Sequence, residues 1–332
     1  MTVESAQAGS REETSGRLRV RVAAKQDEAT DIVSFELVAE SAEPLPAFAA
    51  GAHIDVHVRE GLVRQYSLCN DPAERHRYLI AVLQEPSSRG GSKAMHESIE
   101  VGDVLTISAP RNHFQLATGT RHLLLAGGIG VTPILSMAET LAASGVDFEM
   151  RFCTRSADRT AFRQRIAQSP FAGNVHFHHS EGAASQKFDI EGRLAKPQAD
   201  EHLYVCGPKG FMDAVLSAAR ASGWPEGQLH YEFFAGEVAP SERDESFELE
   251  LARTGKVLLV RKDQTALQAL MEAGVEVESS CEQGVCGTCA TRLLGGIPDH
   301  KDLYFTPEEQ AANDQFTPCC SRAKTARLVL DL

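Results

Sequence analysis

The sequence predicts a chain of three domains: an antiparallel β-barrel, a doubly wound α/β domain and a small α+β domain. A chain of 332 residues is too long for one ordinary hydrophobic core. Up to about Leu116, apolar and polar residues alternate in short segments, whereas from about Gly119 longer apolar runs alternate with helical patterns. An acidic stretch with proline and serine then precedes a segment rich in cysteine.

These changes of pattern set the expected domain boundaries. The first residues are polar and contain no apolar core, so we interpret them as a disordered leader and not as a secretory signal. We interpret the acidic stretch as a solvated linker. The resulting segments are 1–16 (leader), 17–117 (barrel), 118–236 (α/β domain), 237–246 (linker) and 247–332 (cysteine domain).

The barrel is predicted from short alternating segments with turn residues between them. Strands are expected at 18–23, 32–37, 52–58, 78–83 and 104–108. Prolines, glycines and the pair Asp71-Pro72 separate these segments. Many short strands at such spacing are typical of an antiparallel barrel or sandwich.

Two stretches of the barrel carry groups suited to an anion and a planar ring. Arg64 and Tyr66 alternate in one expected strand, so their side chains lie on the same face. The run Arg89-Gly-Gly-Ser92 precedes an amphipathic segment at 93–99, and a glycine turn that opens a helix offers N–H groups to an anion. Taken alone, the first stretch is better explained as an ordinary strand, and the second is a weak signal because glycine-rich turns are common.

The α/β domain is predicted from a buried strand at His122–Ala126, a glycine turn at Gly127-Gly-Ile-Gly130-Val-Thr132-Pro133 and a helix at Ile134–Ser144. This order is the context that a dinucleotide pyrophosphate needs, although the full G-x-G-x-x-G is absent. Further strands are expected at 148–153, 175–178 and 202–206, and helices at 160–167 and 211–221. The last strand ends in Cys206-Gly207-Pro208, at the sheet edge where ligands of such folds bind.

The cysteine domain contains Cys281, Cys286 and Cys289, followed 30 residues later by Cys319 and its neighbour Cys320. The spacing C-x4-C-x2-C with a distant fourth cysteine is typical of plant-type [2Fe–2S] centres. We therefore predict Cys281, Cys286, Cys289 and Cys319 as iron ligands. A zinc site is the alternative, but zinc knuckles favour two C-x2-C pairs and only one is present.

The composition of the chain limits the kinds of partner that the protein is expected to bind and the compartment in which it is expected to lie. The formal net charge of −13 argues against nucleic acid and permits docking to a protein with a basic patch. The sequence contains no apolar run long enough to span a membrane. Eight cysteines, four of them assigned to a cluster, fit a reducing cytoplasm. We expect a monomer that contacts neither nucleic acid nor membrane.

Taken together and in order, the motifs resemble the phthalate dioxygenase reductase family over essentially all of the chain after the leader. The matching motifs are Arg64-Gln65-Tyr66-Ser67-Leu68, Arg89-Gly90-Gly91-Ser92, Gly127-Gly128-Ile-Gly130-Val-Thr132-Pro133, Cys206-Gly207-Pro208, His230-x-Glu232-x-Phe234 and the cysteine set. The run from Arg64 to Pro72 also looks like that of the vanillate demethylase reductases.

The resemblance implies a flavin-binding barrel, an NAD-binding α/β domain and a cysteine domain with the α+β (β-grasp) fold of plant-type ferredoxins. In this family NADH gives a hydride to the flavin, which passes single electrons to the [2Fe–2S] cluster. The cluster delivers them to a separate terminal oxygenase of the Rieske non-haem iron type, such as an aromatic-acid dioxygenase or an O-demethylase. The flavin is needed because it divides a two-electron donor into one-electron steps.

The resemblance also implies roles for individual residues. Tyr66 is expected against the flavin ring, Ser67 near its reactive edge, and Cys206 near the nicotinamide with Glu232 close by. Phe234 is expected to cover the flavin ring, although a core aromatic is the alternative. Cofactor binding is assigned to Arg64, Gln65, Tyr66, Ser67, Val82, Arg89, Gly90, Gly91, Ser92, Gly127, Gly128, Gly130, Thr132, Cys206, Gly207, Pro208 and Phe234, and catalytic roles to Ser67, Cys206, Glu232 and Phe234.

Several choices stay open at the level of sequence. FMN is expected because no clear motif for an adenosine half is visible, with FAD as the alternative. NADH is expected from the family, yet the run Cys153-Thr-Arg155-Ser156 lacks the acid that holds a ribose hydroxyl, and Arg155 could meet a 2′-phosphate. Two other functions are a stand-alone NAD(P)H reductase for other acceptors and a zinc-stabilised redox-sensing protein.

Overall fold

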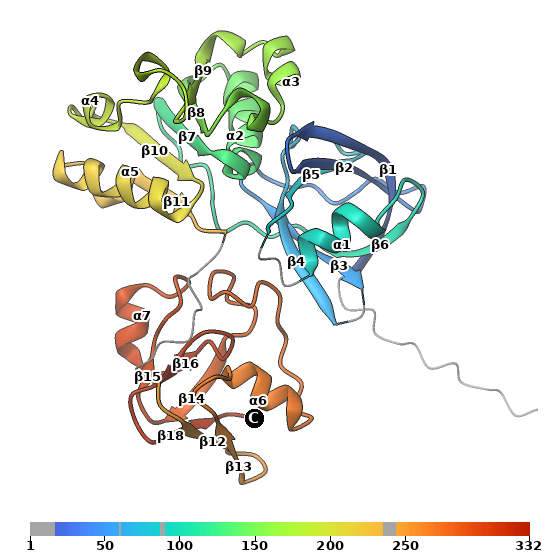
Figure 1. Cartoon of the computed structure of the whole chain (residues 1–332), viewed down its shortest axis with the longest axis vertical. Helices are drawn as coiled ribbons and strands as arrows, with labels where there is room; N and C mark the ends of the chain where they lie inside the picture. Colours follow the sequence, from blue (N-terminus) through green and yellow to red (C-terminus); the bar gives the residue numbers. More distant parts are fainter. Residues whose placement is uncertain (1–16, 60, 87–89, 235–243) are drawn as a thin grey trace, which may run out of the picture.

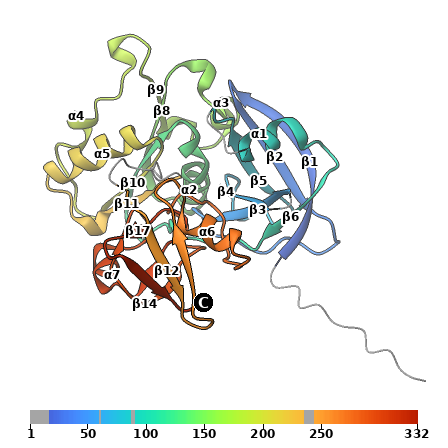
Figure 2. The same ribbon diagram turned by 60° about the horizontal axis from the view of Figure 1, so that its bottom comes forward.

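A computed structural model describes residues 17–59, 61–86, 90–234 and 244–332. The expected leader, Arg89 and most of the expected linker lie outside the described residues. Figure 1 shows three lobes in chain order: the barrel in blue to cyan, the α/β domain in green to yellow and the cysteine domain in orange to red. In the turned view of Figure 2, the cysteine domain lies below the boundary between the other two lobes.

The barrel is built from six antiparallel strands, which confirms the predicted architecture. The strands are β1 (Arg17–Ala29), β2 (Ile32–Ala39), β3 (His53–Arg59), β4 (Leu62–Ser67), β5 (Tyr78–Leu83) and β6 (Val104–Ser108). They follow the order β4-β3-β6-β1-β2-β5, and helix α1 (Gly91–Ser98) packs near β4 and β5. Alternate side chains such as Val20, Val22, Phe35 and Leu37 fill the interior, as the period of two requires.

The α/β domain has a five-stranded, entirely parallel sheet in the order β11-β10-β7-β8-β9. Its strands are β7 (Arg121–Gly127), β8 (Asp147–Thr154), β9 (Val175–His179), β10 (Glu201–Cys206) and β11 (Leu229–Glu232). Its helices are α2 (Val131–Ser144), α3 (Arg163–Gln168), α4 (Ile190–Leu194) and α5 (Lys209–Ala221). One core packs α2 and α3 on one face and another packs α4 and α5 on the other face, so the predicted doubly wound fold is confirmed.

Three helices of this domain differ from the predicted ranges, and α5 differs only in that it begins at Lys209 and not at 211. The helix expected from Ile134 begins earlier, at Val131, because the glycine turn leads directly into it. The helix expected from Thr160 begins only at Arg163. Phe162, immediately before it, has a left-handed backbone with φ of 59°, and a right-handed helix cannot continue through such a residue.

The cysteine domain combines a mixed sheet with one crossing helix, α6 (Ala266–Glu272), as the predicted α+β fold requires. Its main sheet has the order β13-β12-β18-β14-β16, in which β12 and β18 are parallel. The strands are β12 (Phe247–Leu251), β13 (Lys256–Val260), β14 (Thr291–Gly295), β16 (Gln315–Phe316) and β18 (Arg327–Leu330), with a small sheet of β15 (Pro298–Asp299) and β17 (Arg322–Ala323) and a short helix α7 (Pro307–Ala312).

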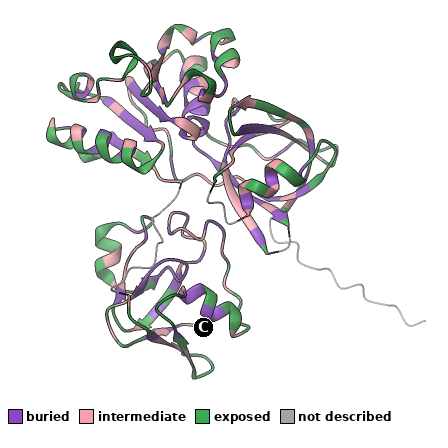
Figure 3. Cartoon of the chain, in the orientation of Figure 1, coloured by how far each residue is buried: buried purple, intermediate pink, exposed green. Residues whose placement is uncertain are grey.

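The barrel and the α/β domain share one apolar core. Phe114 and Cys69 of the barrel are fully buried in the same cluster as Met137, Phe162 and Tyr204 of the α/β domain. Figure 3 shows the buried residues concentrated in the strands of each sheet, with exposed residues on the outer faces of the helices. Burying such large side chains joins the two domains into one packed body.

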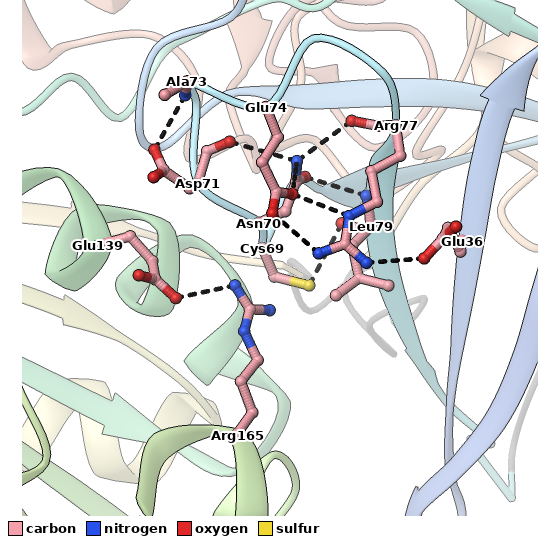
Figure 4. Close-up of polar contacts among 10 residues, drawn as sticks. All are labelled: Glu36, Cys69, Asn70, Asp71, Ala73, Glu74, Arg77, Leu79, Glu139 and Arg165. Atoms are coloured by element: carbon pink, nitrogen blue, oxygen red, sulfur yellow. Dashed lines mark hydrogen bonds and ion pairs between the residues drawn. The ribbon is translucent and has the colours of Figure 1, made fainter. Parts of the chain in front are cut away.

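A polar cluster flanks this shared core (Figure 4). The buried Asn70 orders the loop between β4 and β5, because its side chain donates to Glu74 at 3.1 Å and accepts from the Leu79 N–H at 3.0 Å. From the α/β domain, Arg165 extends toward this loop and pairs with Glu139 at 3.0 Å. These contacts hold the loop after β4 in position beside α2 and α3.

The cysteine domain has apolar cores of its own, centred on α6 and on the buried cysteines. In the parts of the chain that the structure describes, no helix is both long enough and apolar enough to cross a membrane.

Candidate functional site

The three lobes meet around one cavity of about 460 Å³, a size typical of small-molecule and cofactor sites. The barrel contributes side chains from β3, β4 and β5, the α/β domain contributes its glycine turn and the end of β11, and the cysteine domain contributes its cysteine loop (Cys281–Cys289). Of the residues singled out in the sequence, the lining contains Arg64, Gln65, Tyr66, Ser67, Val82, Ser92, Thr132, Glu232, Phe234, Cys281 and Cys286.

On the barrel side, Arg64 and Tyr66 both line the cavity, as alternation along β4 predicts. Burial raises the pKa of the Tyr66 phenol, so its hydroxyl is neutral and the ring forms an uncharged wall. Ser67 is buried at the end of the same strand. One wall of the cavity therefore presents a cation, a ring and a hydroxyl in sequence.

The start of α1 lies directly against Arg64. A Cβ added at Gly91 would come within 2.6 Å of the Arg64 Cγ, so only glycine permits this approach. Gly90 has a left-handed backbone with φ of 92°, which also favours glycine. Ser92 follows in the first turn and lines the cavity. A guanidinium beside the first turn of a helix suits a phosphate, whereas Arg89 lies outside the described residues.

The two turns of the α/β domain pack backbone against backbone. A Cβ added at Gly130 would come within 2.6 Å of the Gly207 nitrogen, and one added at Gly207 within 2.9 Å of the Gly127 Cα. Gly128 has a φ of 52° and borders open space. Thr132 reaches the cavity and donates to the Ile129 carbonyl at 3.1 Å. Such a close approach of two glycine turns at the end of a parallel sheet is typical of a dinucleotide site.

The end of the parallel sheet contributes a thiol and a carboxyl. Cys206 is completely buried, and desolvation together with Glu232 raises the pKa of its thiol well above the usual value. The Oε2 atom of Glu232 is shielded from solvent and has no hydrogen-bond partner among the described residues. Its desolvation raises the pKa of Glu232 to about 8, so this carboxyl is protonated near neutral pH. Phe234 is half-buried against the shared core and lines the cavity.

The thiols of the cysteine domain form two groups, one of two thiols and one of three. The Cys281 thiol lies against that of Cys286, and a hydrogen bond from Cys281 lowers the pKa of Cys286 to about 5. The Cys319 thiol lies against those of Cys289 and Cys320. In the described residues, no three His, Cys, Asp or Glu side chains are placed to hold one metal ion. Thiols gathered at two separate points fit a two-iron cluster better than a single four-ligand zinc ion.

Backbone N–H groups point at these sulfurs. The Gln283 N–H donates to the Cys281 Sγ at 3.3 Å, and the Thr288 N–H donates to the Cys286 Sγ at 3.4 Å. Gly284 and Gly287 have left-handed backbones with φ of 71° and 68°, which let the loop curl around its own sulfurs. The loop is therefore shaped to hold thiolates together and to stabilise their negative charge, as a [2Fe–2S] cluster needs.

Some site residues were not singled out in the sequence. His53 and His113 line the cavity and stack with ring centroids 5.6 Å apart. Burial and the neighbouring Arg111 lower the pKa of His53 to about 4, so it is neutral. His53 could have been found only from its pairing with Ser67 across β3 and β4, which the sequence alone does not give. Other predicted residues lie outside the lining: Gly90, Gly91, Gly127, Gly128, Gly130, Cys206, Gly207, Pro208, Cys289 and Cys319.

Comparison with known protein families matches two parts of the chain. Residues 249–324 match the 2Fe-2S iron-sulfur cluster binding domain, and residues 124–217 match the oxidoreductase NAD-binding domain. The first match covers all five buried cysteines of the cysteine domain, and the second contains the glycine turn.

Relatives match over nearly the whole chain. The vanillate O-demethylase oxidoreductase of Pseudomonas putida is 55% identical over 313 residues, which are 94% of this chain and 98% of that protein. The phthalate dioxygenase reductase of Burkholderia cepacia is 40% identical over 319 residues, which are 96% of this chain and 98% of that protein.

Solved structures give the same picture. Phthalate dioxygenase reductase, described as a modular structure for electron transfer from pyridine nucleotides to [2Fe-2S], matches with a TM-score of 0.77 and 39% identity over 96% of this chain and 98% of that chain. An intact type IV self-sufficient cytochrome P450 monooxygenase matches with a TM-score of 0.80 and 35% identity over 100% of this chain and 43% of that chain.

Proposed function

Because the chain belongs to the phthalate dioxygenase reductase family, which includes the vanillate O-demethylase oxidoreductases, we propose that it serves an oxygenase that acts on an aromatic acid by dioxygenation or O-demethylation. The chain is an NADH-dependent oxidoreductase that transfers electrons through a flavin and a [2Fe–2S] cluster to an oxygenase. The higher identity to the vanillate O-demethylase oxidoreductase supports the O-demethylase type.

The observation that carries this function is the single cavity shared by all three lobes. Arg64, Tyr66 and Ser92 of the barrel, Thr132 of the α/β domain and Cys281 of the cysteine loop line the same space. A bound flavin takes a hydride from a nicotinamide and gives single electrons to an iron–sulfur cluster. The shared cavity supports neighbouring sites for all three groups, with no long route between them.

We propose FMN as the flavin. Arg64, the Gly90-Gly91 turn and Ser92 form a site for a terminal phosphate at the start of α1, which fits a mononucleotide. Tyr66 and Phe234 would hold the ring between them, and Ser67 would bond its edge. Gln65 and Val82 complete this part of the wall.

We propose that the nicotinamide enters beside Phe234 with its pyrophosphate on the turn Gly127–Thr132. Cys206 and the protonated Glu232 would then border the ring and exclude water from it. Arg155, just beyond β8, is exposed. We propose separately that the protein prefers NADH to NADPH. The ratio of kcat/KM for the two nucleotides tests this preference.

We also propose that the protein is a cytoplasmic monomer. All eight cysteines carry free thiols in the structure, which suits a reducing compartment. Size-exclusion chromatography with light scattering tests the oligomeric state.

A visible absorption spectrum before and after anaerobic NADH tests the proposed function. We expect flavin bands over broad cluster absorption, bleaching of both by NADH, and release of FMN after denaturation. Addition of the vanillate O-demethylase oxygenase component should then reoxidise the reductase and consume vanillate. A protein that contains zinc and no colour, or a cluster that NADH does not bleach, would contradict the electron-transfer function.

A further inference from the structure

The cysteine domain meets the barrel through contacts unlike those that join the barrel to the α/β domain. The latter two share an apolar core through Phe114 and Tyr204. Among the described residues, the apolar cores of the cysteine domain contain no residue of the barrel. Domains joined without a large apolar interface are expected to move relative to each other.

The strongest cross-domain contact is a buried hydrogen bond. The Ser280 hydroxyl donates to the Oδ1 atom of Asp55 at 2.8 Å, and both residues are buried. The other carboxylate oxygen of Asp55 pairs with Arg111 of the barrel itself. Because the charge of Asp55 is balanced inside the barrel, separation of the two domains leaves no unpaired buried charge.

The other contacts are weak and lie at the rim. Glu282 of the cysteine loop is 3.9 Å from Arg64, at the limit of an ion pair. The ring of Tyr304 meets that of His113 edge-on, with centroids 6.3 Å apart. Rim contacts of this kind are screened by water and salt, so they steer an approach more than they hold a complex.

The position of the thiols makes the cluster accessible mainly from one side, although the cluster has to both receive electrons and deliver them. Cys281 and Cys286 face the cavity between the barrel and the cysteine domain. Cys289 and Cys319 are buried on the other side, against Leu267 of α6. The cluster is therefore most accessible from the side that the barrel covers. An external electron acceptor has to come equally close to the cluster.

We propose that one face of the cysteine domain, formed by Ser280, Glu282, Leu303 and Tyr304, docks in turn on the barrel and on the terminal oxygenase, so that the domain leaves the barrel between the two transfers. This inference rests on the function proposed above. Leu303 and Tyr304 are 49% and 38% exposed even with the barrel in place. They continue the barrel contact, because the Leu303 N–H donates to the Gly284 carbonyl of the cysteine loop at 2.9 Å.

The chemistry of this face defines its partner. Exposed Glu276 and Glu278 lead into the cysteine loop, which itself carries Glu282. On the barrel, Arg64 lies 3.9 Å from Glu282 and supplies a cation opposite this acidic face. We infer that the oxygenase presents a similar surface, with basic side chains around an apolar contact for Leu303 and Tyr304.

A disulfide lock tests the alternation. In the double variant Asp55→Cys, Ser280→Cys, oxidation should hold the cysteine domain on the barrel. Stopped-flow spectra should still show NADH reducing flavin and cluster, whereas transfer to the vanillate O-demethylase oxygenase component should fall at least about tenfold and return with dithiothreitol. Each single variant, oxidised in the same way, is the control. Unchanged transfer from the locked protein would overturn the proposal and place the exit elsewhere, as on the α6 side.

A surface variant decides the question if the disulfide does not form. Leu303→Glu should raise the KM for the oxygenase about tenfold, because it places a charge in the apolar contact. Leu259→Glu is the matched control, since Leu259 is 62% exposed on β13, far along the chain from the cysteine loop. Equal effects of the two variants, or no effect of either, would contradict the docking face.

Amide hydrogen exchange gives a readout that does not depend on turnover. Addition of the oxygenase component should increase exchange in β3 of the barrel and decrease it at 280–287 and 303–304. Protection at both places would show that the oxygenase binds without displacing the barrel, which contradicts the proposal. A wild-type cluster that NADH does not reduce would instead overturn the proposed function, so the two failures are distinguishable.

Discussion

Cys206 and Glu232 are register partners at the carboxyl ends of the neighbouring parallel strands β10 and β11. This relationship places a buried thiol beside a carboxyl whose Oε2 atom has no hydrogen-bond partner in the described residues. Desolvation of the carboxyl raises its pKa to about 8, and the negative form of Glu232 also raises the pKa of the Cys206 thiol. Both groups are therefore neutral near pH 7, which suits a site that accepts a dinucleotide carrying its own negative charge.

Replacement of Glu232 by Gln should flatten the dependence of stability on pH. The folded protein holds the Glu232 proton up to about pH 8, whereas the unfolded chain releases it near its ordinary pKa of 4.5. The free energy of unfolding should therefore fall as pH rises between these values, by at most about 4–5 kcal/mol, and then level off. The neutral amide removes this slope.

The single tryptophan makes this measurement specific to the α/β domain. Trp224 is buried in the core that contains α5, so its fluorescence during urea unfolding reports on that domain. Glu226→Gln, an exposed carboxyl in the segment just before β11, is the control and should leave the slope in place. Parallel pH profiles of wild type and Glu232→Gln would show that this carboxyl does not hold the proton.

Gly130→Ala should separate the two turns that form the dinucleotide site. Its methyl group would lie within 2.6 Å of the Gly207 nitrogen, so the backbone has to shift. We expect a loss of about 2 kcal/mol in stability and a rise of about tenfold or more in the Kd for NADH. Gly145→Ala is the matched control, because Gly145 follows the far end of α2, borders open space and costs only the left-handed strain of about 1 kcal/mol. Similar Kd values for both variants would contradict the role of the packed turns.

Local patterns were sufficient to predict most elements of the fold. Strands β5 and β6 have the expected bounds. The start of α3 was predicted wrongly, because Phe162, which is buried in the shared core, has a left-handed backbone that the sequence pattern does not indicate. The short strand β11 was not predicted, since four residues give too little periodicity.

The cavity could be predicted only in parts. The sequence indicated Arg64, Tyr66 and the cysteine spacing, each of which follows from neighbours in the chain. The proximity of β4 to Cys281 depends on packing between domains, and no local pattern contains that information. His53 and His113 were not predicted as cavity residues for the same reason. Their position at the boundary is defined only when the lobes meet.

Arg64→Ala should weaken flavin retention. Arg64 lies against the start of α1, where its guanidinium would add charge-assisted hydrogen bonds to a phosphate. Loss of such bonds should raise the Kd for the flavin about tenfold or more. Arg19→Ala is the control, because Arg19 is an exposed arginine of β1 that pairs with Glu40 away from the cavity. Flavin content after desalting is the measurement, and equal content in both variants would count against the phosphate role of Arg64.

The last prediction concerns which of Cys319 and Cys320 is the fourth iron ligand. Cys319→Ser should abolish the cluster, because its thiol lies against that of Cys289, as the second pair of ligands requires. Cys320→Ser should retain the cluster spectrum, since the Cys320 thiol, which also lies against that of Cys319, meets the Thr317 hydroxyl at 3.4 Å and points at Gly284. Iron and sulfide content together with the electron paramagnetic resonance spectrum of the dithionite-reduced protein distinguish the two variants. A cluster that survives in Cys319→Ser and is lost in Cys320→Ser would exchange the two assignments, because the spacing of ligands in a two-iron centre admits only one of these neighbours.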